Sequence, residues 1–404
     1  MSTPAMTADV VVADAPSIVS GESVYDWSGF YVGAGGGYGA VVHELSSPIF
    51  GGVTFNGIGG EGFFGEITAG YDFQFSNGVV AGVAASGRYG NIGTSLDVFG
   101  LNADLNAEYG FDIVGRLGYT VAPNTLAYVL GGYTWQHFDL STNFGFGTDW
   151  NSGGYVLGLG MEHVLRGKWT LKSEYRYAKY NSQDFFGGGL SVDPSTHTFH
   201  TTLNYRFNGG PSGTTASPVN YDWTGIKVGL AAGGGAIVHD TDLFGSIIDF
   251  DGFGSEGFLG DINVGYDREI GNGYLIGGVL AARISNMELE TTAPGFSNSL
   301  QAEYGFDALL RFGKLFNSRT LAYVIGGYTY EHFDYSTSGG GSADWNLGGY
   351  TLGTGMEVAF TDRITGYTEY RFSHFGSEDF GTGGLIEIGP SSHTVRVGAK
   401  FKLY

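Results

Sequence analysis

Three histidines recur at equivalent places in the two halves of the chain, and imidazole is well suited to metal binding and proton transfer near neutral pH. A carboxylate follows in the sequence at Glu44 and Asp139, and again at Asp240 and Asp334. Imidazole combined with carboxylate suits zinc or nickel, so a metal or proton-responsive site is one hypothesis. The interpretation we favour is hydrogen bonding at loop bases and interfaces, with no metal or cofactor. The histidines are His43, His137, His197, His239, His332 and His393.

Two serines lie beside these histidines and raise the hypothesis of a nucleophile. Ser195 is two residues from His197, and Ser392 precedes His393. A nucleophile needs its base within hydrogen-bond reach and a third group to orient that base. The sequence carries no local signature of such a trio, so we expect no enzyme activity.

The whole chain is a tandem repeat. Tyr25-Asp26-Trp27-Ser28-Gly29 returns as Tyr221-Asp222-Trp223-Thr224-Gly225, and the correspondence continues to the end at an offset of about 196 residues. This period exceeds that of any solenoid unit. Each copy is therefore a domain of its own or half of one closed object. We place a lead-in at residues 1–24, the first copy at 25–207, a linker at 208–220 and the second copy at 221–404. The composition of the lead-in indicates a flexible segment.

The composition favours a β-barrel in a membrane. Glycine accounts for 73 of 404 residues, aromatic residues for 15% and charged residues for only 15%. So much glycine disfavours helices, and no apolar run is long enough for a membrane-spanning helix. The net charge of −21 argues against nucleic acid as a partner, and without cysteine there is neither a disulfide nor thiolate chemistry.

Alternation of apolar and polar residues predicts eight antiparallel strands in each copy. Near 105–119, Leu105, Ala107 and Tyr109 fall on one face, whereas Glu108 and Asp112 fall on the other. The expected strands reach about 13–17 residues, longer than the five or six usual in soluble sheets. Short turns alternate with expected long loops at 45–60, 92–104, 140–150 and 181–195. This asymmetry is typical of outer-membrane barrels.

The ends of the first copy resemble a known family. Asp26-Trp27-Ser28-Gly29-Phe30-Tyr31-Val32-Gly33 resembles the first strand of the small eight-stranded surface barrels of alphaproteobacterial outer membranes, and Leu203-Asn204-Tyr205-Arg206-Phe207 resembles their closing strand. The resemblance implies a Gram-negative outer membrane, with a signal peptide absent or removed here. It also implies lipid, lipopolysaccharide and the barrel-assembly machinery as partners, and leaves homo-oligomers open. Doubling departs from the family, as does the ending Phe401-Lys402-Leu403-Tyr404.

Two tandem eight-stranded up-and-down barrels are the fold we expect, with one sixteen-stranded barrel as the alternative. An eight-stranded barrel has room only for side chains, so charges inside it must pair. Each copy supplies a near-balanced inward set. The lumen residues are Glu66, Asp72, Arg88, Glu108, Asp112, Arg116, Glu162, Lys172, Glu174, Arg176 and Arg206 in the first copy, and Asp261, Asp267, Arg283, Glu303, Asp307, Arg311, Glu357, Glu369, Arg371, Arg396 and Lys400 in the second.

Tryptophans near strand ends are interpreted as aromatic girdles at the membrane interface: Trp27, Trp150, Trp169, Trp223 and Trp345. We expect a structural, surface-interacting protein with at most small passive permeability. The alternatives are a sixteen-stranded diffusion porin and, at low weight, a barrel enzyme that modifies lipid A.

Overall fold

The computed structural model describes residues 22–48, 52–216, 219, 221–244, 247–380 and 385–403, and every regular element in these ranges is a β-strand. Within the same ranges, no helix is long and apolar enough to cross a bilayer. Most of the lead-in, residues 1–21, lies outside the described residues, as do Ser217, Pro218 and Asn220 of the linker and Tyr404.

The first repeat closes into a ring of eight antiparallel strands. Each strand pairs with the next, and the last, β10, returns to pair with β2 from Ser191↔Ser46 to Arg206↔Tyr31. The short strand β9 (Gln183–Phe185) adds to the edge of β10. The ring consists of β2 (Gly29–Ser47), β3 (Val53–Gln74), β4 (Val79–Val98), β5 (Leu101–Ala122), β6 (Thr125–Thr142), β7 (Gly147–Arg166), β8 (Trp169–Tyr180) and β10 (Leu190–Arg206).

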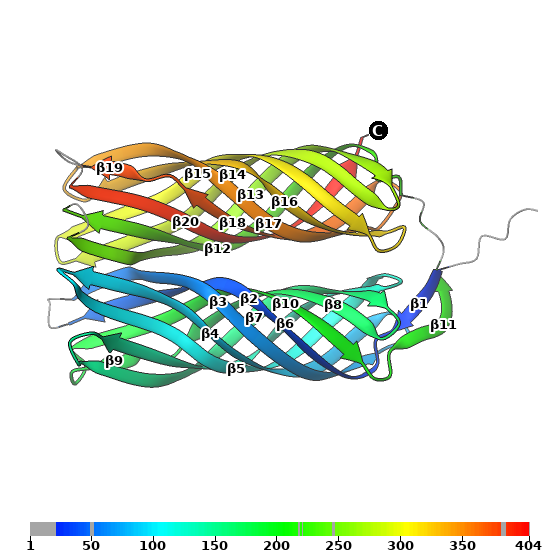
Figure 1. Ribbon diagram of the computed structural model, residues 1–404, viewed down its shortest axis with the longest axis horizontal. Coiled ribbons are helices and arrows are strands. Elements are labelled where there is room, and N and C mark those ends of the chain that lie inside the picture. Colours follow the sequence, from blue (N-terminus) through cyan, green and yellow to red (C-terminus); the bar gives the residue numbers. More distant parts are fainter. Residues whose placement is uncertain are drawn as a thin grey trace, which may run out of the picture.

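The second repeat closes in the same way, with β20 pairing back to β12 from Ile386↔Leu243 to Lys402↔Lys227. Figure 1 shows the two barrels side by side with their axes roughly parallel. The predicted two-barrel fold is therefore confirmed. The strands of the second barrel are β12 (Gly225–Leu243), β13 (Ile248–Gly271), β14 (Tyr274–Ala293), β15 (Phe296–Leu315), β16 (Thr320–Thr337), β17 (Ser342–Ala359), β18 (Ile364–Phe375), β20 (Ile386–Lys402) and the short β19 (Glu378–Phe380).

Short turns gather at one end of both barrels, which we call the turn end, and we call the other the loop end. The linker and the C-terminus lie at the turn end (Figure 1). The expected long loops at 45–60 and 92–104 are wrong, because both segments are largely paired strand. β4 and β5 stay paired up to Val98↔Leu101, and Phe99 (φ 55°) and Gly100 (φ 80°) make a two-residue turn. Such a turn matches the twist of the flanking strands. The paired strands therefore continue to the tip of this hairpin, where a long loop was expected.

Between its ends each strand places apolar side chains outward and polar ones inward. On β3, Phe63, Ile67 and Phe73 are 71%, 70% and 51% exposed, whereas Glu66 and Asp72 point inward and are buried. Lipid is the only surrounding that rewards an outer belt of this kind.

At the loop end the two barrels exchange strand ends. β3 pairs with β4 only as far as Glu61↔Gly93, and beyond that Thr54–Asn56 pairs with Glu290–Thr292 of β14. Reciprocally, β13 pairs with β14 as far as Glu256↔Glu288, and then Ile248–Phe250 pairs with Leu96–Val98 of β4. Followed through these outer ladders, the strand order closes as one sixteen-stranded circuit around both barrels. Two rings at the turn end thus share one rim at the loop end.

The linker and the lead-in meet outside the barrels. Glu22–Asp26 forms β1, and Gly210–Ala216 forms β11, which pairs with it in an antiparallel ladder (Figure 1). The expectation of a flexible lead-in up to residue 24 and a flexible linker is therefore wrong for these segments. Two edge strands that would each be left unpaired satisfy each other's backbone groups here.

Candidate functional site

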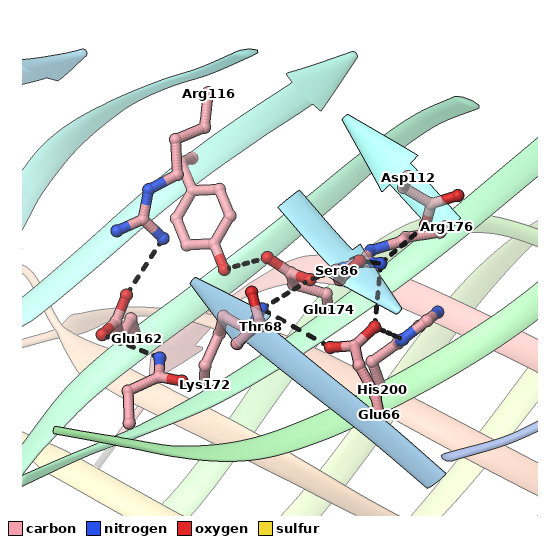
Figure 2. A network of polar contacts seen from close by, with 12 residues as sticks. Glu66, Thr68, Ser86, Asp112, Arg116, Glu162, Lys172, Glu174, Arg176 and His200 are labelled. Carbon is pink, nitrogen blue, oxygen red and sulfur yellow. Dashed lines mark hydrogen bonds and ion pairs between the residues drawn. The ribbon is translucent and has the colours of Figure 1, made fainter. Parts of the chain in front are cut away.

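The lumen of the first barrel is filled by a network of buried ion pairs. Arg176 is its centre, with Nη1 2.9 Å from Glu66 and 2.8 Å from Asp112, and with Nη2 bonded to Glu174. Figure 2 shows this guanidinium between carboxylates that come from strands across the barrel. Lys172 lies 3.1 Å from Glu174 on the same strand. Every partner is itself buried, so these charged side chains pack against one another across the lumen.

Two further layers lie above and below this centre. Towards the loop end, Arg88 binds Asp112 at 2.7 Å and also reaches Gln136 and the Tyr180 hydroxyl. Towards the turn end, Arg116 and Arg206 both bind Asp72 and Glu162, and Arg206 lies 2.8 Å from each carboxylate. Each layer thus contains both cations and carboxylates.

The second barrel repeats the layers with some exchanged residues. Arg371 binds Asp307 and Glu369, each at 2.6 Å, and lies 3.9 Å from Asp261. The other contacts are Arg283 with Asp307 and Glu331, Arg396 with Asp261, Arg311 with Glu357 and Asp267, Lys227 with Asp267 and Glu357, and Lys400 with Glu357.

A compensating exchange links the two lumens. In the first barrel Glu66 faces Lys172 at 3.8 Å and His200 at 2.8 Å. At the equivalent places the second barrel has Tyr367 for Lys172 and Arg396 for His200, facing Asp261 at 3.6 Å. A cation lost at one position is thus regained on the neighbouring strand of the barrel, which is what a buried charge cluster requires, since unpaired buried charge is costly.

Two predicted lumen residues, Glu108 and Glu303, lie outside the network. Each falls where β5 or β15 carries one extra residue relative to its neighbour, between Ala107 and Gly110 and between Ala302 and Tyr304. A bulge of this kind reverses which side chains point inward. Glu303 is accordingly exposed, 3.8 Å from His332, and Glu108 is only half-buried. For the same reason Leu105 and Ala107, predicted to face outward, pack in the lumen.

The prediction that the tryptophans lie at the membrane interface is also wrong for four of the five. Trp27 and Trp223 are buried, and they close the turn ends of the lumens under cations, with Arg206 4.8 Å from the Trp27 ring and Lys227 4.7 Å from the Trp223 ring. Trp150 and Trp345 stack inside the loop ends on Phe138 and Phe333. Trp169 alone of the five is exposed, at 46%. Nearness to a strand end does not decide which face a side chain occupies.

The six predicted histidines do not converge. His43 and His239 are buried in the lumens beside Phe138 and Phe333. His137 and His332 lie on the outer faces, each bonded to an asparagine and stacked on a tyrosine. Among the described residues, no group of three or more His, Asp or Glu side chains could hold a metal ion. The six histidines therefore occupy three different surroundings and do not share one site.

The remaining pair, His197 and His393, lies between the barrels in a contact that we call the seam. His197 and Ser195 of the first repeat both bind Glu256 of the second, at 2.9 and 2.8 Å. His393 and Ser391 of the second repeat both bind Glu61 of the first, at 2.6 and 2.7 Å. Serine and histidine therefore share a carboxylate rather than bind each other.

Several lumen residues were not found from the sequence. His200 alternates in phase with Arg206, the predicted inward residue on β10, so phase alone could have identified it; no inward residue was predicted on β12, where Lys227 lies. Glu331 replaces Gln136 of the first repeat, and a comparison of the two repeats would have revealed it.

The chain is similar in sequence to known outer-membrane proteins. Residues 12–207 match the family model described as "Outer membrane protein beta-barrel domain". The 31 kDa outer-membrane immunogenic protein of Brucella melitensis is 32% identical over 231 residues, which cover 51% of this chain and 95% of that protein. The 22 kDa outer membrane protein of Rhizobium leguminosarum is 28% identical over 39% of this chain and 67% of the relative. Neisserial surface protein A superposes with a TM-score of 0.28, at 17% identity, over 45% of this chain and 98% of that chain.

Proposed function

Because this chain belongs to the family of outer-membrane β-barrel proteins of Gram-negative bacteria, we propose that it is a structural, surface-exposed protein with closed lumens rather than a diffusion porin. The turn end then faces the periplasm and the loop end faces outward. The outer rim is the part that meets lipopolysaccharide and extracellular molecules.

The filled lumen carries this proposal. In the first barrel five carboxylates, Glu66, Asp72, Asp112, Glu162 and Glu174, face five cations, Arg88, Arg116, Lys172, Arg176 and Arg206. Porin lumens hold water, whereas a lumen packed with paired and buried charged side chains contains no open channel for a solute. To open a path, ions would have to separate in surroundings of low dielectric constant, at a cost of several kcal/mol for each pair.

The shared rim does not favour the porin alternative, because the sixteen-stranded circuit exists only above Glu61 and Glu256. Below these residues each ring is complete. A solute that entered the rim would meet two plugged barrels.

Single-channel recording in planar bilayers tests the proposal. Closed lumens predict an absence of stable openings beyond a small leak over the whole voltage range. The informative control is a variant that carries Arg116→Ala and Arg206→Ala, which removes both cations of the turn-end layer and should raise the leak. A stable, large conductance in the unaltered protein would overturn the proposal and favour a porin.

A further inference from the structure

We propose that the seam is a self-recognition surface, so that the face by which each repeat binds its tandem partner also binds a second copy of the same repeat. The chain would then be a two-fold dimer of barrels joined by a linker. Interfaces of this kind are isologous, which means that the same patch is used on both sides.

The polar contacts of the seam come in equivalent pairs. Glu61 binds Ser391 and His393, and the equivalent Glu256 binds Ser195 and His197. A Glu61 carboxylate would therefore find the same serine and histidine on a copy of its own repeat. These carboxylates lie on outward faces near the loop end, where a barrel alone in lipid would leave them without these partners.

The residues nearest to the two-fold axis meet their own equivalents. Thr125 Oγ1 lies 3.1 Å from Thr320 Oγ1 at the turn end. At the loop end Gly59 contacts Gly254, and Ala40 and Val42 cluster with Ala236 and Val238. At these positions, where each residue meets its own counterpart, the contact needs no second, different surface.

The exchanged strand ends follow the same rule. The outer end of β3 pairs with β14, and the equivalent end of β13 pairs with β4. Each repeat therefore gives one strand end and accepts one. This reciprocity is the property that lets identical units swap elements and close as a dimer.

The seam residues that bind the two carboxylates or meet their own counterparts are the same in both repeats, whereas some lumen residues and some other seam residues, such as Phe199 against Val395, differ. Glutamate, serine, histidine, threonine and glycine are identical at the seam positions named above. Lumen positions differ, with Tyr31 against Lys227, Gln136 against Glu331 and Lys172 against Tyr367. A lumen needs only internal charge balance, but a self-complementary face works only if both sides match.

A disulfide across the axis tests the proposal, because the chain has no cysteine of its own. In the unaltered tandem, the Thr125→Cys, Thr320→Cys variant should oxidise in the membrane to a cross-linked chain. A disulfide needs the two Cβ atoms about 3.5–4.5 Å apart, and the two threonine hydroxyls lie 3.1 Å apart, so the two side chains face each other across the seam. The cross-link is read as faster migration on a non-reducing gel, and the Thr142→Cys, Thr337→Cys pair at the loop end of the same strands is the control.

The decisive chain carries a second copy of residues 25–207 in place of residues 221–403, with Thr125→Cys in both copies. Self-recognition predicts that most of this chain cross-links and that the band resists heat as the parent does. Glu61→Arg and Gly59→Val in both copies should reduce the cross-link several-fold and leave each barrel folded. A heat-resistant chain without the cross-link would overturn the proposal. So would a chain that fails to fold, because its only new barrel-to-barrel contact is that of the first repeat with itself.

Discussion

Gly59 and Gly254 touch where β3 and β13 cross between the barrels: a Cβ built on Gly59 would lie 2.6 Å from the Cα of Gly254, and one built on Gly254 would lie 2.8 Å from the Cα of Gly59. No side chain fits at this distance, so the exchange of strand ends depends on glycine at both positions.

Replacement of Gly59 by valine should therefore undo the exchange. The segment Thr54–Asn56 loses β14 as its neighbour, and limited proteolysis from the outer side should cut residues 53–60 at least ten times faster. Gly210→Val is the matched control, because no atom lies within 4 Å of the position of its Cβ. Equal cleavage rates in the two variants would mean that the crossing does not depend on glycine.

Arg176 should be the most sensitive residue of the first lumen. Arg176→Met leaves Glu66, Asp112 and Glu174 facing one another without their shared cation. Loss of one partner from a buried ion network costs about 3–5 kcal/mol. We expect the urea midpoint of unfolding in detergent to fall accordingly, whereas Arg363→Met, on an exposed turn, should change it by about 0.5 kcal/mol or less.

The exchange between the lumens predicts a rescue. Lys172→Tyr alone removes a cation near Glu66, and His200→Arg alone adds one, so each single variant should lose stability. The double variant reproduces the charge arrangement around Asp261 of the second barrel. A double-mutant cycle should give a favourable coupling of about 1–3 kcal/mol. Additive losses would show that the two positions act independently.

Tryptophan fluorescence can separate the two faces of the barrel. Trp27 and Trp169 both lie near the turn end, but Trp27 is buried in the lumen and Trp169 is 46% exposed on the outer face. Brominated lipids should quench a variant that retains only Trp169 and spare one that retains only Trp27. Similar quenching of both would contradict the inward position of Trp27.

Strand alternation predicted the fold and most of the lumen, because inward phase alone identifies Asp112 and Arg116 once a barrel is assumed. It failed at Glu108 and Glu303, because one inserted residue reverses the phase and leaves no mark in the composition. It also failed at Trp27, whose place under Arg206 depends on a contact 179 positions away in the chain. The near-balanced inward charges of each copy favoured two rings over one, but the shared rim left no signal in the sequence, since it depends on where β3 leaves β4.

Because the rim is shared, residues of one repeat line the mouth of the other barrel. A cavity of about 460 Å³ at the mouth of the second barrel is lined by Leu289, Tyr335 and Trp345 of the second repeat and also by Phe55 of the first. A substitution in the first repeat can therefore change the shape of the cavity at the mouth of the second barrel. The loop ends of the two repeats are then expected to evolve together, even though the two barrels are separate rings at the turn end.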